Sequence, residues 1–317
     1  MLPSDLSDAI YADADKAREY LEAIRWPDGA YCPHCGTTAE RVTKLEGKKH
    51  RKGLYQCNEC LEQFTVTVGT LYERSHIPLH KWLLATHLLC SSKKGISAHQ
   101  LMRNLGLGSY RTAWFMAHRI REGMKPAKAA PLGGEGKTVE ADTTYIGGKE
   151  KNKHRSKRTK GNIGGKGKMI AHTLVERGGR ARSDHIANVA GKTLRPIVMK
   201  QVSRKSSFMT DTAGGYMEMG KEFARHEMVD HGAGEYVRGD AHSNTVESYF
   251  ATLKRGVTGV YHHVSEAHLK RYLAEFDFRY NERSALGVDD ASRTIKALQG
   301  ITGKRLTYRR TDEAANP

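Results

Sequence analysis

Three carboxylates in the C-terminal half stand where phosphodiester chemistry could use them. Asp142 lies in "VEADTTYIGG", a β-branched stretch that predicts a strand, and Asp211 ends the short apolar strand "FMTD". Glu247 lies in "HSNTVESYFATLKRG", whose apolar spacing predicts an amphipathic helix. Carboxylates from such distant elements can converge on two divalent ions roughly 3.5–4 Å apart, and oxygen ligands suit Mg²⁺. The pattern predicts a centre that activates a nucleophilic oxygen and steadies a leaving 3′ oxygen.

Each of these carboxylates has competitors. Glu140 precedes Asp142 by two residues, so both side chains leave the same face of the strand. Asp240 and Asn244 compete with Glu247 for the third position. An aspartate at a strand end also commonly serves as a turn or cap residue, so position alone leaves these alternatives open.

The helix that carries Glu247 has a second charged group, Lys254. The two are seven residues apart, which is two turns along one face. That separation is too long for an i,i+4 ion pair. We expect the helix to pack on a sheet through a stripe of four apolar residues, Val246, Tyr249, Phe250 and Leu253.

Two C-x2-C pairs, "CPHCG" and "CNEC", lie near the N-terminus with 21 residues between them. Two such hairpins can place four thiolates around one ion, which predicts a closed, structural Zn²⁺ site rather than a catalytic one. A redox function is the alternative. We expect His34 to be exposed and Cys90 to be a buried core residue. The predicted zinc ligands are Cys32, Cys35, Cys57 and Cys60.

Changes in composition and apolar patterning along the chain predict its division into segments. "QFTVTVGT" alternates as a strand, while "KPAKAAPLGGEGK" has a linker's composition. After the linker, "KMIAHTLVERGG" and "RARSDHIANV" continue the first strand into a meander, and alternating strands and helices follow, which predicts a mixed α/β domain. The predicted segments are an N-terminal helix (1–27), a zinc ribbon (28–75), a helix-turn-helix (76–126), a linker (127–137), the α/β domain (138–290) and a C-terminal tail (291–317).

The segment 95–124 is predicted to form a helix, a glycine-containing turn and a second helix. Ser97 and Ser109 stand at the expected N-caps. A recognition helix needs hydrogen-bond donors on its exposed face to read a major groove. A plain helical hairpin is the alternative. The candidate DNA contacts of the second helix are Arg111, Arg119 and Arg121.

The composition favours a polyanionic partner. Lys+Arg 52 against Asp+Glu 35 give a net charge of +17. The segment 149–168 contains nine Lys or Arg and one acid, so it suits phosphates or else forms a solvated loop. No apolar run is long enough for a membrane span, no signal peptide is evident, and the cysteine usage fits a reducing cytoplasm near the nucleoid. The further candidate DNA contacts are Lys149, Lys151, Lys153, Arg155, Lys157, Arg158, Lys160 and Arg255.

Taken together, these motifs resemble the DDE transposases of bacterial insertion sequences. More narrowly, the chain is similar to the subgroup with an N-terminal zinc ribbon and an RNase H-like (ISXO-type) catalytic domain. The resemblance rests on "WPDGAYCPHCG", "VEADTTYIGGK", "TDTAGGY" and "HSNTVESYFATLKRGVTGVYHHVSEAHLKRYLAEFDFRYNER", and on the 35 residues between Asp211 and Glu247. It spans about residues 15–290.

The resemblance implies an RNase H-like fold, two Mg²⁺ (or Mn²⁺) ions, recognition of terminal inverted repeats, 3′-end cleavage and strand transfer into target DNA. It implies that Asp142, Asp211 and Glu247 bind metal and that Lys254 contacts DNA near the cleaved end. The spacing to Lys254 favours Glu247 over Asn244. A homodimer or larger assembly on DNA is expected. The rivals are a catalytically inactive DNA-binding regulator and an RNase H-like nuclease or resolvase.

Other polar residues near the C-terminus remain open. His262 and His263 follow the helix of Glu247 and could form a second metal site, contact DNA or simply pack. Arg279, Asn281 and Arg283 end the last strongly patterned helix and could support the carboxylate cluster or the DNA backbone.

Overall fold

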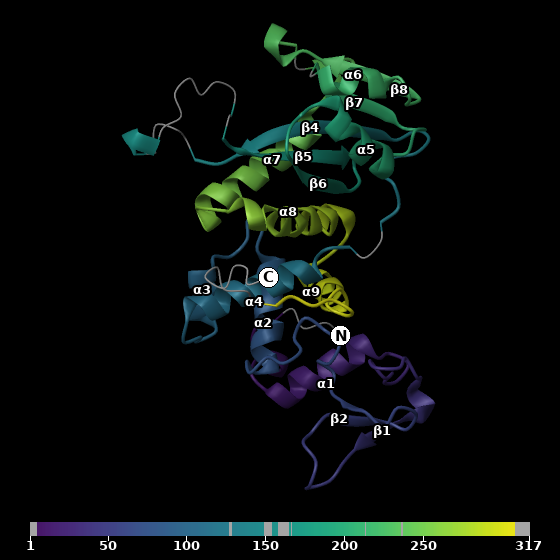
Figure 1. The fold of residues 1–317 in the computed structure, drawn as a ribbon, viewed down its shortest axis with the longest axis vertical. Helices are drawn as coiled ribbons and strands as arrows, with labels where there is room; N and C mark the ends of the chain where they lie inside the picture. Colours follow the sequence, from purple (N-terminus) through teal and green to yellow (C-terminus); the bar gives the residue numbers. More distant parts are fainter. Residues whose placement is uncertain are drawn as a thin grey trace, which may run out of the picture. The chain divides into compact units, whose positions relative to one another are not determined.

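The chain divides into two compact units in the computed structural model (Figure 1). One unit combines Met1–Ala127 with Gly287–Pro317, and the other is Lys128–Leu286. The chain therefore leaves the first unit, builds the second and returns. The structure describes residues 5–126, 129–148, 154–157, 165, 167–212, 214–235 and 237–307.

Helices make most of the first unit. Ser97 and Ser109 accept hydrogen bonds from the backbone N–H groups of Gln100 and Thr112, which confirms both predicted N-caps. The last helix, α9, packs against α2, α1 and α4 and buries Leu298, although we had placed residues 291–317 in a tail. The helices are η1 (Ala9–Tyr11), α1 (Ala14–Arg25), α2 (Leu79–Ser91), α3 (Ala98–Asn104), α4 (Tyr110–Gly123) and α9 (Asp290–Gln299).

The cysteine module forms a three-stranded antiparallel sheet in the order β1-β2-β3. The strand expected over "QFTVTVGT" was predicted too long, because β3 covers only Gln63–Phe64. The Arg25 guanidinium donates to the carbonyls of Val66 and Val68, so this backbone turns instead of pairing. The remaining elements here are η2 (Ala39–Arg41), β1 (Val42–Leu45) and β2 (Leu54–Cys57).

The second unit is built on a five-stranded mixed sheet in the order β6-β5-β4-β7-β8. β5 is antiparallel to both neighbours, whereas β4, β7 and β8 are parallel, so the predicted meander is followed by crossovers through helices. This is the RNase H-like arrangement that the resemblance implied. The strands are β4 (Thr138–Ile146), β5 (Met169–Glu176), β6 (Ala181–Ile186), β7 (Ser207–Asp211) and β8 (Arg225–Val229).

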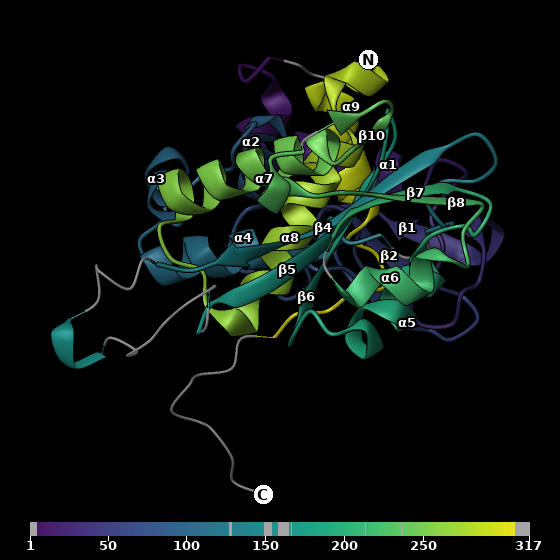
Figure 2. The same cartoon turned by 90° about the horizontal axis from the view of Figure 1, so that it is seen from above.

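Helices cover both faces of this sheet (Figure 2). Because side chains alternate along β4, Val139 and Ala141 face a core with α5 (Gly191–Gln201) and α6 (Gly214–Gly220). The opposite face packs against α7 and α8, and all four residues of the predicted α7 stripe are buried there. The other elements are α7 (Asn244–Gly256), α8 (Glu266–Asn281), η4 (Arg155–Lys157), η5 (His231–Ala233), β9 (Val237–Arg238), β10 (Ala241–His242), η6 (Val257–Tyr261) and η7 (Ser284–Leu286).

No helix in the described part of the chain combines the length and the apolar character needed to cross a membrane.

Candidate active site

Asp142 lies at the centre of the second unit, on the middle strand β4. Its register partner on β5 is Thr173, and its Oδ1 accepts a hydrogen bond of 2.6 Å from the backbone N–H of Thr143. Burial raises the pKa of Asp142 to about 7, against the opposing hydrogen bond from Thr143. Partial burial of the carboxylate therefore outweighs the hydrogen bond that stabilises its charged form.

The other predicted residues act electrostatically on Asp142. Asp211, at the end of the parallel neighbour β7, and Glu247, in the first turn of α7, both raise its pKa, and Lys254 lowers it. The Ser243 hydroxyl donates to Glu247 Oε1 at 3.3 Å. The fold therefore brings four residues that are spread over 113 positions of sequence (142 to 254) into one charged cluster.

The possible ligand atoms of this cluster are less closely grouped than those of the four cysteines. Among the described residues, only the four cysteines form a group of three or more possible ligands with all ligand atoms within 4.8 Å of one another. The oxygens of Asp142, Asp211 and Glu247 are thus more spread out.

Glu140 competed with Asp142 in the sequence, and its contacts separate the two. Its side chain is completely buried, and its carboxylate accepts from Arg177 Nε at 2.6 Å and from the backbone N–H groups of Thr245 and Val246 at 2.8 and 3.0 Å. Both oxygens are engaged by protein donors. The Glu140 carboxylate is therefore part of the internal hydrogen bonding of this unit.

The structure also shows where the two competitors of Glu247, Asp240 and Asn244, lie. Both carboxylate oxygens of Asp240 accept from the Arg225 guanidinium at 2.7 Å, which makes it one half of an exposed ion pair. Asn244 is the first residue of α7 and is exposed. Glu247, by contrast, raises the pKa of Asp142.

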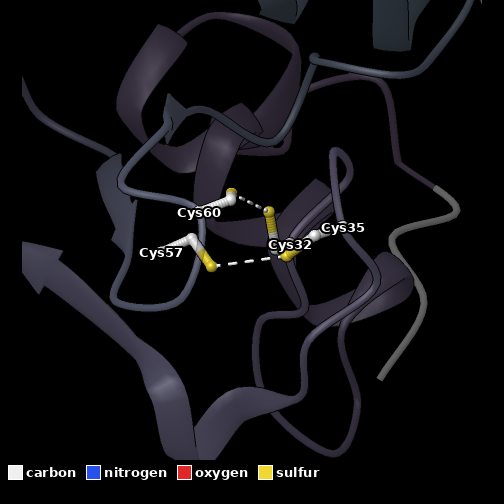
Figure 3. A group of neighbouring side chains, drawn as sticks. All are labelled: Cys32, Cys35, Cys57 and Cys60. Carbon is white, nitrogen blue, oxygen red and sulfur yellow. Dashed lines mark hydrogen bonds between the residues drawn. The ribbon is translucent and has the colours of Figure 1, made fainter.

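In the zinc ribbon, the four predicted cysteine ligands converge (Figure 3). The sulfur atoms of Cys32 and Cys60 are 3.6 Å apart, as are those of Cys35 and Cys57. Four thiolates at about 2.3 Å from one Zn²⁺ would be roughly 3.8 Å apart, so the cluster fits a structural zinc with no open position. Hydrogen bonds from Thr37 lower the pKa of Cys35 to about 6, which favours the ligating thiolate.

The three arginines of α4 differ in exposure. Arg111 is exposed near the start of the helix. Arg119 donates to the carbonyls of Glu73 and Leu306 and lies over the Trp82 ring. Arg121 is only 2% exposed, so the prediction that it contacts DNA is wrong for this conformation. It lies on the buried face of α4 instead.

The basic loop is only partly described. Arg155 is exposed and Lys157 shares the short helix η4 with it, and Arg255 is exposed at the end of α7. Five predicted DNA contacts lie outside the described residues: Lys149, Lys151, Lys153, Arg158 and Lys160.

The residues at the end of α8 hold the neighbouring hairpin in place. Asn281 accepts from Ala181 N at 2.6 Å and donates to Ala181 O at 2.9 Å, and Arg283 donates to Gly179 O. Arg279 pairs with Glu275 in the interior. These contacts indicate a structural role rather than support of the carboxylates or of DNA.

His262 and His263 are both exposed just after α7. Within the described ranges, neither belongs to a group of possible metal ligands, so a second metal site at this place has no support.

A buried polar network escaped the sequence-based prediction. The Asp277 carboxylate accepts from Tyr249 OH at 2.6 Å, from Ser183 Oγ at 2.7 Å and from Ser183 N at 2.8 Å. Burial raises the pKa of Asp277 to about 6, despite these hydrogen bonds. The network joins α7, α8 and β6 two residues from Glu247. Its only sequence signal was a polar position within an otherwise apolar helix face.

Two protein families and one relative match this chain. Residues 131–281 match the ISXO2-like transposase domain, and residues 12–63 match the transposase zinc-ribbon domain. An uncharacterized protein in transposable element ISH50 of Halobacterium salinarum is 31% identical over 277 residues, which cover 83% of this chain and 90% of the relative.

The fold, the four-cysteine ribbon and the carboxylate-bearing sheet define a transposase of the DDE class. Within that class the chain belongs to the ISXO2-like transposases of insertion sequences, which confirms the resemblance seen in its motifs.

Proposed function

We propose that this transposase binds the terminal inverted repeats of its element, cleaves their 3′ ends and joins them to target DNA, using two Mg²⁺ or Mn²⁺ ions. The observation that carries the proposal is the raised pKa of Asp142, which results from burial and from the facing carboxylates of Asp211 and Glu247. A centre with this excess negative charge is suited to divalent cations.

Bound ions would activate the attacking oxygen and stabilise the leaving 3′ oxygen. The residues of the chain have separate roles. Asp142, Asp211 and Glu247 would hold the ions from a strand, a strand end and a helix. Lys254, exposed two turns beyond Glu247, would bind a phosphate near the cleaved end. Joining two ends requires a dimer or a larger assembly on DNA.

The net charge of +17 and the zinc ribbon with its adjacent helix-turn-helix support DNA as the substrate. Arg111, Arg155, Lys157 and Arg255 are the candidate contacts among the described residues. The four-cysteine cluster would hold Zn²⁺ as a structural element of the end-binding segment.

The test is a cleavage and joining assay on a duplex from the DNA that brackets the gene, with a target plasmid and Mg²⁺. We expect Asp142→Asn, Asp211→Asn and Glu247→Gln each to lower cleavage at least about 100-fold, since each removes charge that binds the ions. Glu218→Gln is the matched control, because Glu218 is an exposed carboxylate of the same unit.

The outcomes separate the rival functions. Full activity of any of the three variants would refute the assigned site. Cleavage without covalent joining to the target would indicate a nuclease or resolvase. Specific binding of the end duplex with no Mg²⁺-dependent cleavage by the unaltered protein would indicate a regulator.

A further inference from the structure

One ion pair in the interior of the second unit connects the central sheet to the start of α7. Glu140 on β4 and Arg177, which follows β5, are bonded through Arg177 Nε and Glu140 Oε1 at 2.6 Å. The Glu140 side chain is completely buried. Charged groups withdrawn from water in this way are costly unless their hydrogen-bonding capacity is satisfied.

Here the remaining capacity of Glu140 is used by α7. Its Oε2 accepts from Thr245 N at 2.8 Å and Val246 N at 3.0 Å, and its Oε1 accepts from Thr245 Oγ1 at 2.8 Å. These N–H groups belong to the first turn of a helix, which normally needs a cap from the residue just before it. Ser243, at that position, makes no side-chain cap hydrogen bond. A carboxylate 105 residues earlier in the chain takes its place.

Arg177 holds the segment that leads into the helix. Its Nη1 donates to Asp240 O at 2.8 Å and its Nη2 donates to His242 O at 2.9 Å. The guanidinium therefore joins the Glu140 carboxylate to the short hairpin β9–β10, which ends two residues before α7 begins.

These contacts lie between the proposed metal ligands. Glu140 precedes Asp142 by two residues on the same face of β4, a separation of about 7 Å. At the other end, Val246, whose N–H bonds Glu140, is the immediate neighbour of Glu247. One side chain thus links the strand of the first carboxylate to the helical turn of the third.

We propose that Glu140, oriented by Arg177, is a positioning residue that sets the distance between Asp142 and Glu247 so that both can bind the same pair of ions. The proposal rests on the proposed function of those two carboxylates. An apolar contact would stabilise the helix as well, but it would not fix its rotation and register, because it lacks the direction of a hydrogen bond.

The test compares metal affinity with folding. Glu140→Gln removes the charge and turns an amide NH₂ toward Arg177 or toward the helix N–H groups, so α7 should shift relative to β4. We expect Mn²⁺ affinity of the protein on the end duplex, measured by electron paramagnetic resonance, to fall about 10–100-fold. The Mg²⁺ concentration for half-maximal cleavage should rise by a similar factor, while DNA affinity should stay unchanged.

Glu275→Gln is the matched control. Glu275 pairs with Arg279 on α8 and is as completely buried as Glu140. It also accepts a hydrogen bond from the Tyr261 hydroxyl, which lies beyond the far end of α7. This variant should lose stability without losing metal affinity. An equal loss of metal affinity in both variants, or none in Glu140→Gln, would overturn the proposal.

Three further variants keep the test decisive. Thr245→Val removes only the hydroxyl contact to Glu140 and should raise the metal requirement by a smaller factor, even if Glu140→Gln fails to fold. An unchanged metal requirement in Thr245→Val together with an unfolded Glu140→Gln would count against positioning. If Asp142→Asn and Glu247→Gln bind Mn²⁺ normally, the proposed function fails instead, which is a distinguishable result.

Discussion

At the scale of single residues, Asp142 is the most informative group in the chain. Burial, together with the charges of Asp211 and Glu247, raises its pKa to about 7 against the opposing Lys254. Burial and the neighbouring carboxylates therefore disfavour the charged form of Asp142, which makes the site sensitive to pH.

Without added metal, we expect the protein to lose stability as the pH rises from about 4 to about 7. The folded-state pKa of Asp142, about 7, exceeds its ordinary value of 3.8, so the folded protein holds a proton that the unfolded chain has released. The free energy of unfolding should therefore fall between about pH 4 and pH 7. At 1.4 kcal/mol per pKa unit, the upper limit of this loss is about 4 kcal/mol.

Urea unfolding of the wild type and of Asp142→Asn at several pH values, without added Mg²⁺ or Mn²⁺, measures this effect. The variant should give a flatter profile, and the difference between the two proteins removes the contribution of Asp277. Added Mn²⁺ should stabilise the wild type more at pH 8 than at pH 6, because it competes with the proton. Parallel profiles for the two proteins would contradict the assigned environment of Asp142.

At the scale of elements, helix α4 separates two kinds of arginine that look alike in the sequence. Arg111 is exposed in the first turn, whereas Arg121 is 2% exposed on the packed side. Spacing along a helix shows which residues share a face, but the face that becomes buried depends on what packs there. DNA contact by this helix is therefore expected near its start.

We expect Arg111→Ala to weaken binding of the end duplex and to reduce the salt dependence of binding by about one counterion. Arg121→Ala should instead lower the melting temperature and leave that slope unchanged, since it removes a buried side chain. Fluorescence anisotropy at several salt concentrations measures both. A reduced slope in Arg121→Ala alone would show that the exposed face has been assigned the wrong way round.

At the scale of the whole molecule, α9 packs in the same unit as α1. The chain builds the RNase H-like unit between residues 128 and 286 and then returns, so that α9 completes the helical unit begun near the N-terminus. Leu298 of α9 is completely buried there. Residues that follow the RNase H-like unit in sequence thus contribute to the stability of the first unit.

We expect Leu298→Ala to destabilise the first unit by about 2–5 kcal/mol, because the shorter side chain would leave a cavity beside α9, which packs against α2. All three tryptophans, Trp26, Trp82 and Trp114, belong to this unit, so their fluorescence reports its unfolding. Gln299→Ala, at an exposed neighbouring position, is the control. Equal stability of the two variants would show that residues 290–299 behave as a tail after all.

The sequence by itself determined the elements that local chemistry specifies. The C-x2-C pairs, the serine caps of α3 and α4, the β-branched content of β4 and the apolar stripe of α7 each depend on residues within a few positions of one another, so their structure could be predicted. The choice of Asp142, Asp211 and Glu247 came from spacing and from a family resemblance.

Only the tertiary structure decided which polar side chains meet across the chain. Glu140 bonds Arg177 and the start of α7, which are 37 and 105 residues away, and Asp277 bonds β6 from α8. No local pattern encodes such pairs, because a carboxylate on a strand face looks the same whether it binds a metal or a helix. The fold assigns these roles, since the order of strands and helices fixes which donors each carboxylate can reach.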